Sequence, residues 1–164
     1  MLSNGLAENL PNITIIGVTI GLTLVLAIIS VIDLRTLRIP DLLSLPLIGT
    51  GLILAFIVPK ADATEHLIGA AGAFALFAGL GEFYYRKRGL DGLGLGDAKL
   101  FAAAGAWLGW QNLPLVLLIA TTGGLAQALF MQSFQRDKQL AFGPWIALGF
   151  WTVWIWICWH GYTG

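Results

Sequence analysis

The sequence contains few charged residues: Asp, Glu, Lys and Arg together fill 11% of its 164 positions. A soluble domain usually carries about 25% charged residues. Hydrophobic residues make up 57% of the chain, and its mean hydropathy is +0.81. This shortage of charge excludes an ordinary soluble domain, so we expect an integral membrane protein embedded in a lipid bilayer. The formal net charge is zero, and the positions of the charges are therefore more informative than their sum.

Cysteine is nearly absent, because Cys158 is the single cysteine of the chain. This excludes an intrachain disulfide and a zinc site built from cysteines. Residues 1–12 contain no Lys or Arg, and no small-x-small cleavage signal follows the first apolar run, so we expect no signal peptide. The apolar runs also lack the alternation of apolar and polar residues that membrane-spanning strands show. We therefore expect a single all-α membrane domain over residues 1–164.

Uncharged runs close to the ~20 residues that cross a hydrocarbon core recur along the chain. Pro40 disfavours helix at Ile39 and separates the first two runs. The uncharged run from Leu100 to Gln135 is too long for one span, and a turn at residues 111–114 (QNLP) divides it. The pattern predicts six transmembrane helices, over residues 13–32, 42–58, 67–85, 98–110, 115–134 and 140–159. Tryptophans crowd the last of these, where we expect an aromatic belt.

The basic residues indicate the orientation of the six spans. Three of the connections lie on one face of the membrane and hold eight of the nine basic residues, namely Arg35, Arg38, Arg86, Lys87, Arg88, Lys99, Arg136 and Lys138. Only Lys60 lies on the opposite face. The positive-inside rule therefore places both termini on the side of the membrane away from the cytoplasm. It also places Asp33, at the end of the first span, and Asp97, at the start of the fourth, at the same cytoplasmic depth.

Two carboxyl groups in a site of low dielectric constant cannot both ionise cheaply, so Asp33 and Asp97 would share one proton if their helices are neighbours. The ionised member can then take a proton from water while the protonated member polarises a carbonyl, as in aspartic proteases. Gly94 and Gly96 leave room for an extended peptide and allow a positive φ in the turn before the fourth span.

Each of these residues also has a simpler interpretation. Either aspartate, taken alone, can be an anchor at the membrane interface, and Asp97 is a candidate helix cap. Lys99 can be a cytoplasmic-side cation, and Asp41 can mark the start of the second span. Glu82 can lie at the interface or line the site.

Three segments resemble those of type IV prepilin peptidases, which are membrane aspartic proteases. Residues 94–100 (GLGDAKL) resemble the GxGDxKL segment of that family, and residues 33–46 (DLRTLRIPDLLSLP) resemble its first-aspartate segment. Residues 142–144 (FGP) resemble its late FGP motif. The resemblance implies that Asp33 and Asp97 are the catalytic pair and that the two glycines support the active-site turn. Lys99 and Asp41 match motif positions, to which no role is assigned.

The resemblance implies an aspartic endopeptidase of the bacterial inner membrane. Such an enzyme removes the basic leader peptide of type IV prepilins and pseudopilins at the cytoplasmic face of the membrane. The expected partners are these substrates and a pilus, type II secretion or Tad machinery, without nucleic acid, cofactor or metal. The long members of the family carry paired CxxC motifs, which Cys158 alone cannot form. The chain therefore resembles the short, peptidase-only members, and no methyltransferase activity is expected.

Two other functions remain open from the sequence. One is a catalytically silent assembly factor of a pilus or secretion system that has kept the fold. The other is a proton-coupled transporter, because acidic residues within membranes also mark ion pathways. In a transporter the essential acids would lie near the middle of the membrane on broken helices, whereas Asp33 and Asp97 are predicted at its inner boundary.

Overall fold

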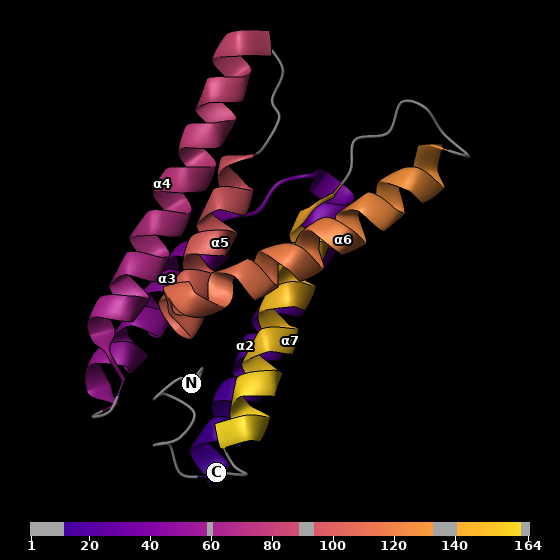
Figure 1. Ribbon diagram of the computed structural model, residues 1–164. Helices are drawn as coiled ribbons and strands as arrows, with labels where there is room; N and C mark the ends of the chain where they lie inside the picture. The colour runs from indigo at the N-terminus through magenta and orange to yellow at the C-terminus, as the bar shows by residue number, and fades with distance from the viewer. Residues whose placement is uncertain (1–11, 59–60, 89–93, 133–140, 162–164) are drawn as a thin grey trace.

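The structure, a computed structural model, describes residues 12–58, 61–88, 94–132 and 141–161 (Figure 1). Over these ranges it is helical and contains no strand. The elements are α2 (Asn12–Thr36), α3 (Asp41–Ile57), α4 (Ala63–Arg88), α5 (Leu95–Leu108), the 3-10 helix η1 (Trp110–Asn112), α6 (Leu113–Gln132) and α7 (Gly143–Gly161). The predicted all-α class is confirmed. Lys60, Arg136 and Lys138, which the orientation argument used, lie outside the described residues.

Three of the described helices are long and apolar enough to cross a membrane: Thr14–Thr36, Ala63–Lys87 and Trp110–Phe130. The apolar helices Asp41–Ile57 and Gly143–Trp159 are shorter. The long uncharged run is divided as predicted, but the break lies earlier than residues 111–114, because α5 ends at Leu108, η1 follows, and α6 begins at Leu113. Gly109 makes this turn possible with a φ of 75°, a backbone conformation that favours glycine.

α2 continues four residues beyond the predicted span, through Asp33 to Thr36. It ends where Leu37 adopts a φ of 53°, the one positive φ of a non-glycine residue in the described ranges. The Leu37 N–H donates a hydrogen bond of 2.8 Å to the Asp33 carbonyl, as in a left-handed helix cap. Asp33 therefore lies in the last turn of a helix rather than in a loop, and its position is fixed by helix geometry.

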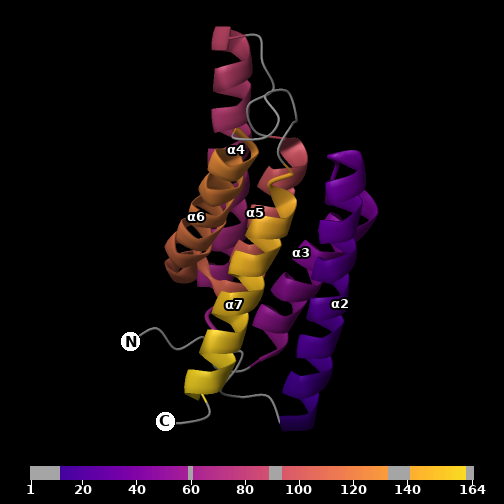
Figure 2. The same ribbon diagram turned by 90° about the vertical axis from the view of Figure 1, so that its right-hand side faces the viewer.

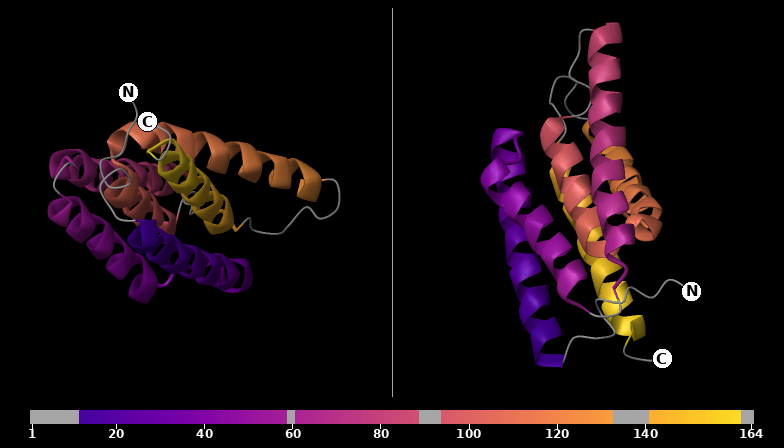
Figure 3. Two further views of the ribbon diagram at one scale, coloured as in Figure 1. Left: turned by 90° about the horizontal axis from the view of Figure 1, so that it is seen from below. Right: turned by 90° about the vertical axis from the view of Figure 1, so that its left-hand side faces the viewer.

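α5 is the central helix of the molecule (Figure 2). It packs against α3, α4 and α7, and every residue from Leu100 to Leu108 is buried. Its alanines and glycine allow close helix contacts. A Cβ on Gly105 would collide with the backbone of Gly69 in α4, so these two glycines bring the helices together. The sequence predicted α5 as a span like the others, whereas the structure shows that other helices surround it (Figure 3).

Figure 1 shows that α2 ends and α3, α5 and α7 begin toward the same end of the bundle, while α4 runs past these helix ends and α6 crosses the bundle obliquely. α2 and α7 lie side by side along most of their length, where Trp154 and Trp151 donate hydrogen bonds to Thr19 and Thr23 of α2. Trp154 is fully buried. The prediction that the tryptophans of α7 form a lipid-facing belt is therefore wrong for Trp154, which belongs to the core.

Candidate active site

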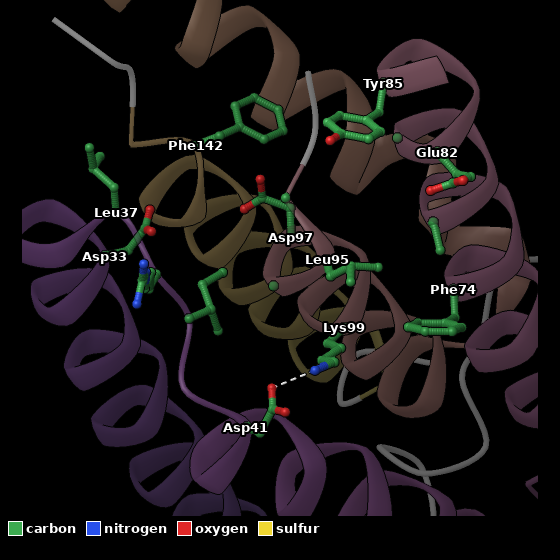
Figure 4. Close-up of a pocket in the computed structure, with 16 residues that line it drawn as sticks. Asp33, Leu37, Asp41, Phe74, Glu82, Tyr85, Leu95, Asp97, Lys99 and Phe142 are labelled. Carbon is green, nitrogen blue, oxygen red and sulfur yellow. Dashed lines mark hydrogen bonds and ion pairs between the residues drawn. The ribbon is translucent and has the colours of Figure 1, made fainter. Parts of the chain in front are cut away.

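An open cavity of about 1370 Å³ lies at the end of the bundle where α2 ends and α3, α5 and α7 begin (Figure 4). All six site residues proposed from the sequence line it, and they come from α2, α3, α5 and the residue before α5. They are Asp33, Asp41, Gly94, Gly96, Asp97 and Lys99. The folding of the chain thus brings the two aspartate-containing segments to one cavity.

Asp33 lies in the last turn of α2 and is 5% exposed. Its Oδ2 accepts a hydrogen bond of 2.9 Å from the backbone N–H of Gly143, the first residue of α7. A buried carboxyl group needs such a partner, because leaving it unpaired in an apolar interior costs free energy. Figure 4 shows the Asp33 and Asp97 side chains facing each other across the cavity.

Asp97 is the third residue of α5 and lies outside the candidate membrane spans. The residue at the helix N-cap is Gly94, so Asp97, which the sequence left open as a candidate, is not the cap. The pKa of Asp97 is raised from its ordinary value of 3.8 to about 6, mainly by burial and also by the charge of nearby Asp33, while a hydrogen bond to the Gly94 backbone acts in the opposite direction. A like charge close enough to raise this pKa is one condition for two carboxyl groups to share a proton.

The expectation of a positive φ at Gly94 or Gly96 is wrong. Gly94 has a φ of −69°, and in the described ranges the only glycine with a positive φ is Gly109. The first turn of α5 follows directly from Gly94, and a helix start needs no left-handed residue. Gly96 instead gives space: a Cβ there would lie 3.0 Å from the Ile39 Cβ, tighter than most side-chain contacts. It lets the start of α5 pack directly against the chain that joins α2 to α3.

Lys99 and Asp41 form an ion pair with a distance of 2.5 Å between Nζ and Oδ1. The Lys99 side chain is 22% exposed and the Asp41 side chain 60% exposed, so the pair lies on the rim of the cavity. Asp41 is the first residue of α3 and Lys99 belongs to the second turn of α5. The ion pair therefore joins the two segments that carry the catalytic candidates.

One face of α4 forms the opposite wall of the cavity. Its residues recur at helical spacing, as Phe74, Ala78, Gly81, Glu82 and Tyr85. The wall is apolar toward the middle of the helix and polar at its end, where Glu82 forms an ion pair of 2.6 Å with Arg86. The sequence left open whether Glu82 lies at the membrane interface or lines the site. In the structure Glu82 lines the cavity.

The sequence reasoning gave no site role to several residues of this cavity, among them Leu37, Phe142 and most of the α4 wall, or to the donor Gly143. The FGP segment was recognised, but no spacing rule connects it to Asp33, which lies 110 residues earlier. In the parts of the chain that the structure describes, no three His, Cys, Asp or Glu side chains gather as a metal site would require.

Residues 20–129 match the family described as the type IV leader peptidase family. The chain is 43% identical over 123 residues to the prepilin leader peptidase/N-methyltransferase of Escherichia coli K12, covering 74% of this chain and 55% of that protein. The protein of the same name from Pectobacterium carotovorum is 40% identical over 144 residues, covering 85% and 51% of the two chains. The one from Aeromonas hydrophila is 35% identical over 138 residues, covering 82% and 48%.

The chain belongs to the type IV leader peptidase family. The matched range includes Asp33, Asp41, Asp97 and Lys99 and ends before the FGP segment. The chain spans about half the length of the curated relatives it matches. No solved structure gives a significant match.

Proposed function

We propose that the protein is an aspartic endopeptidase that removes the leader peptide of type IV prepilins or pseudoprepilins, with Asp33 and Asp97 as its catalytic pair. The observation that carries the proposal is the meeting of these two carboxyl groups, from α2 and α5, in one open cavity. The names of the relatives, which are prepilin leader peptidases, supply the substrate class.

In the proposed reaction the two aspartates hold one proton between them. The ionised carboxylate takes a proton from water, and the resulting hydroxide adds to the carbonyl carbon of the scissile peptide bond. The protonated carboxyl group donates to the carbonyl oxygen, where negative charge develops. The tetrahedral intermediate then collapses with cleavage of the C–N bond. The departing nitrogen receives the proton that was taken from water, and a hydroxyl group of the intermediate returns one proton to the aspartate pair, which ends with the single proton it began with. The products are a leader with a new carboxyl group and a pilin with a new amine.

The distribution of charge supports an orientation in which the cavity faces the cytoplasm of a bacterial inner membrane. Arg35, Arg38, Arg86 and Lys87 lie on the last turns of α2 and α4 or directly after them, and Lys99 lies near the start of α5, so all belong to the cavity end. By the positive-inside rule, this end is cytoplasmic and both termini are periplasmic. A substrate whose apolar helix lies in the bilayer would then present its leader at the level of the two aspartates.

The position of the aspartates also supports a peptidase over a transporter. Asp33 lies in the last turn of its helix and Asp97 in the first turn of its own. Both carboxyl groups are therefore at the boundary of the bundle, where a peptide chain emerging from the membrane can reach them. The proposal includes the expected partners: the processed substrate would serve a pilus, type II secretion or Tad machinery.

Co-expression with a prepilin from the same genome tests the proposal. The wild-type protein should convert the prepilin to a shorter form on a gel, and Asp33→Asn and Asp97→Asn should abolish this conversion. Asp62→Asn is the matched control, because Asp62 precedes α4 at the opposite end of the bundle and an asparagine keeps its bond to the Thr64 N–H. Processing by either aspartate variant would refute the catalytic pair.

A further inference from the structure

The first turn of α7 presents a single backbone donor to Asp33. The N–H groups of Trp145 and Ile146 bond to the Phe142 carbonyl, so Phe142 is the cap of this helix and Gly143 its first residue. A helix leaves its first N–H groups without partners inside the helix. Pro144, the second residue, has no N–H to offer. The Gly143 N–H is therefore the donor left to pair outside the helix, and it donates to Asp33 Oδ2 at 2.9 Å.

Gly143 also has no room for a side chain. A Cβ at this position would lie 2.7 Å from Asp33 Oδ2, 2.9 Å from its Cγ and 3.2 Å from its Cβ. All three atoms belong to the buried side chain that the Gly143 N–H holds. Any residue other than glycine must therefore push the Asp33 carboxyl group from its place. The backbone at Gly143 is helical, so the requirement is for space rather than for an unusual φ.

The neighbours of Gly143 hold it in this position. Phe142 lines the same cavity as the two aspartates, and Pro144 fixes the backbone of the first helical turn. The three residues thus have separate roles. Phe142 caps α7, Gly143 provides the N–H donor to Asp33, and Pro144 lacks an N–H that could compete with it. This gives a physical account of a segment that the sequence analysis noted without a role.

We propose that Gly143 is a positioning residue of the active site, whose backbone N–H fixes the orientation of the Asp33 carboxyl group toward Asp97. The inference rests on the proposed function for its catalytic meaning. The contact itself can be tested without any cleavage assay. A charge-assisted bond from a helix N-terminus is among the stronger hydrogen bonds to a carboxylate, which suits a group that must keep one orientation through the reaction.

Kinetics in detergent or liposomes test the effect on catalysis. Gly143→Ala should lower kcat about 10- to 100-fold, because small misplacements of reacting groups have effects of this size, and should leave KM within about twofold. Gly149→Ala is the matched control in the same helix: its Cβ would lie 2.7 Å from the Val116 carbonyl oxygen, far from Asp33. That variant should lose thermal stability but keep its kcat when folded. An unchanged kcat in Gly143→Ala would overturn the inference and leave the proposed function intact.

A stability cycle tests the contact. Gly143→Ala should lower the thermal unfolding midpoint of the wild-type protein but have a much smaller effect in an Asp33→Ala background, where the displaced side chain is gone. Gly149→Ala should lower the midpoint equally in both backgrounds.

If Gly143→Ala does not accumulate, the double variant should accumulate as well as Asp33→Ala does. Equal losses in both backgrounds, or failure of the double variant alone, would overturn the inference. If the cycle shows coupling but the wild-type protein cleaves no prepilin, the proposed function fails and the contact stands.

Discussion

The Lys99 ammonium group lies 2.5 Å from the Asp41 carboxylate and joins the start of α5 to the start of α3 (Figure 4). Asp97 is two residues before Lys99, and Asp33 precedes the turn that leads to Asp41. The ion pair therefore links the helix that carries Asp97 to the helix that follows Asp33 in the chain. Its partial exposure limits its contribution to stability to roughly 0.2–1 kcal/mol.

The ion pair predicts a charge-reversal rescue. Lys99→Asp and Asp41→Lys should each reduce prepilin cleavage, because like charges then face each other between α3 and α5. The double variant Lys99→Asp/Asp41→Lys should recover part of the lost activity, since the pair is restored with opposite sense. Cleavage rates of the four proteins form a double-mutant cycle. Losses that simply multiply would show that the two side chains act independently, for example by contacting the substrate.

The raised pKa of Asp97 predicts a gain in stability when its charge is removed. Ionising Asp97 is harder in the folded protein, where its pKa is about 6, than in the unfolded chain, where it is near 3.8. The penalty is absent below pH 3.8, grows between 3.8 and 6, and is constant above pH 6. The free energy of unfolding of Asp97→Asn should therefore exceed that of the wild type at pH 8 by about 1–3 kcal/mol, which a higher thermal unfolding midpoint would show. The difference should vanish near pH 4, and a variant that is less stable at pH 8 would contradict this argument.

The proton that Asp33 and Asp97 are proposed to share predicts how cleavage depends on pH. The pair keeps its one proton up to an apparent pKa near 6, the value of Asp97, so kcat/KM should fall as the pH rises through that value. The Asp62→Asn control should show the same profile as the wild type. A rate that is constant from about pH 4 to 8, or that already falls near the ordinary pKa of an isolated aspartate, ~3.9, would exclude the shared proton.

The close approach of α4 and α5 predicts a contrast between two glycines. Gly105→Ala should destabilise the protein by at least about 2 kcal/mol, because its Cβ would collide with the Gly69 backbone, which cannot move aside as a flexible side chain can. Gly72→Ala in α4 should be neutral or stabilising by up to ~1 kcal/mol, since no atom lies within 4 Å of its added Cβ. Thermal unfolding of the two variants in the same detergent checks the prediction, and equal effects would contradict it.

Much of the fold could be predicted from the apolar runs of the sequence and from the prolines and polar residues that interrupt them. In the described residues each of the six predicted apolar segments corresponds to an α-helix, and the break before Pro114 divides α5 from α6. The hydropathy pattern could not show that α5 is enclosed by other helices, because a helix that faces lipid and a helix buried in a protein core have the same apolar composition. It also ended the first helix at Ile32, whereas hydrogen bonding carries α2 on to Thr36, since charged side chains do not stop a helix.

The candidate site was predictable to the extent that it lies on recognisable segments. The six residues chosen from the sequence do line one cavity. What the sequence could not provide are contacts between distant segments: Gly143 with Asp33, Gly96 with Ile39, and the face of α4 that forms the far wall. Such contacts depend on which helices are neighbours, and a single sequence carries no direct signal of that.

The most direct test of the account is the turnover of a purified prepilin by reconstituted wild-type protein, Asp33→Asn, Asp97→Asn and the double variant. If the two aspartates act as one unit, each single variant should lose at least about 100-fold in kcat, and the double variant should be no worse than either. A single variant that retains a rate within about tenfold of the wild type, or losses that multiply in the double variant, would contradict the central claim that Asp33 and Asp97 form one catalytic pair.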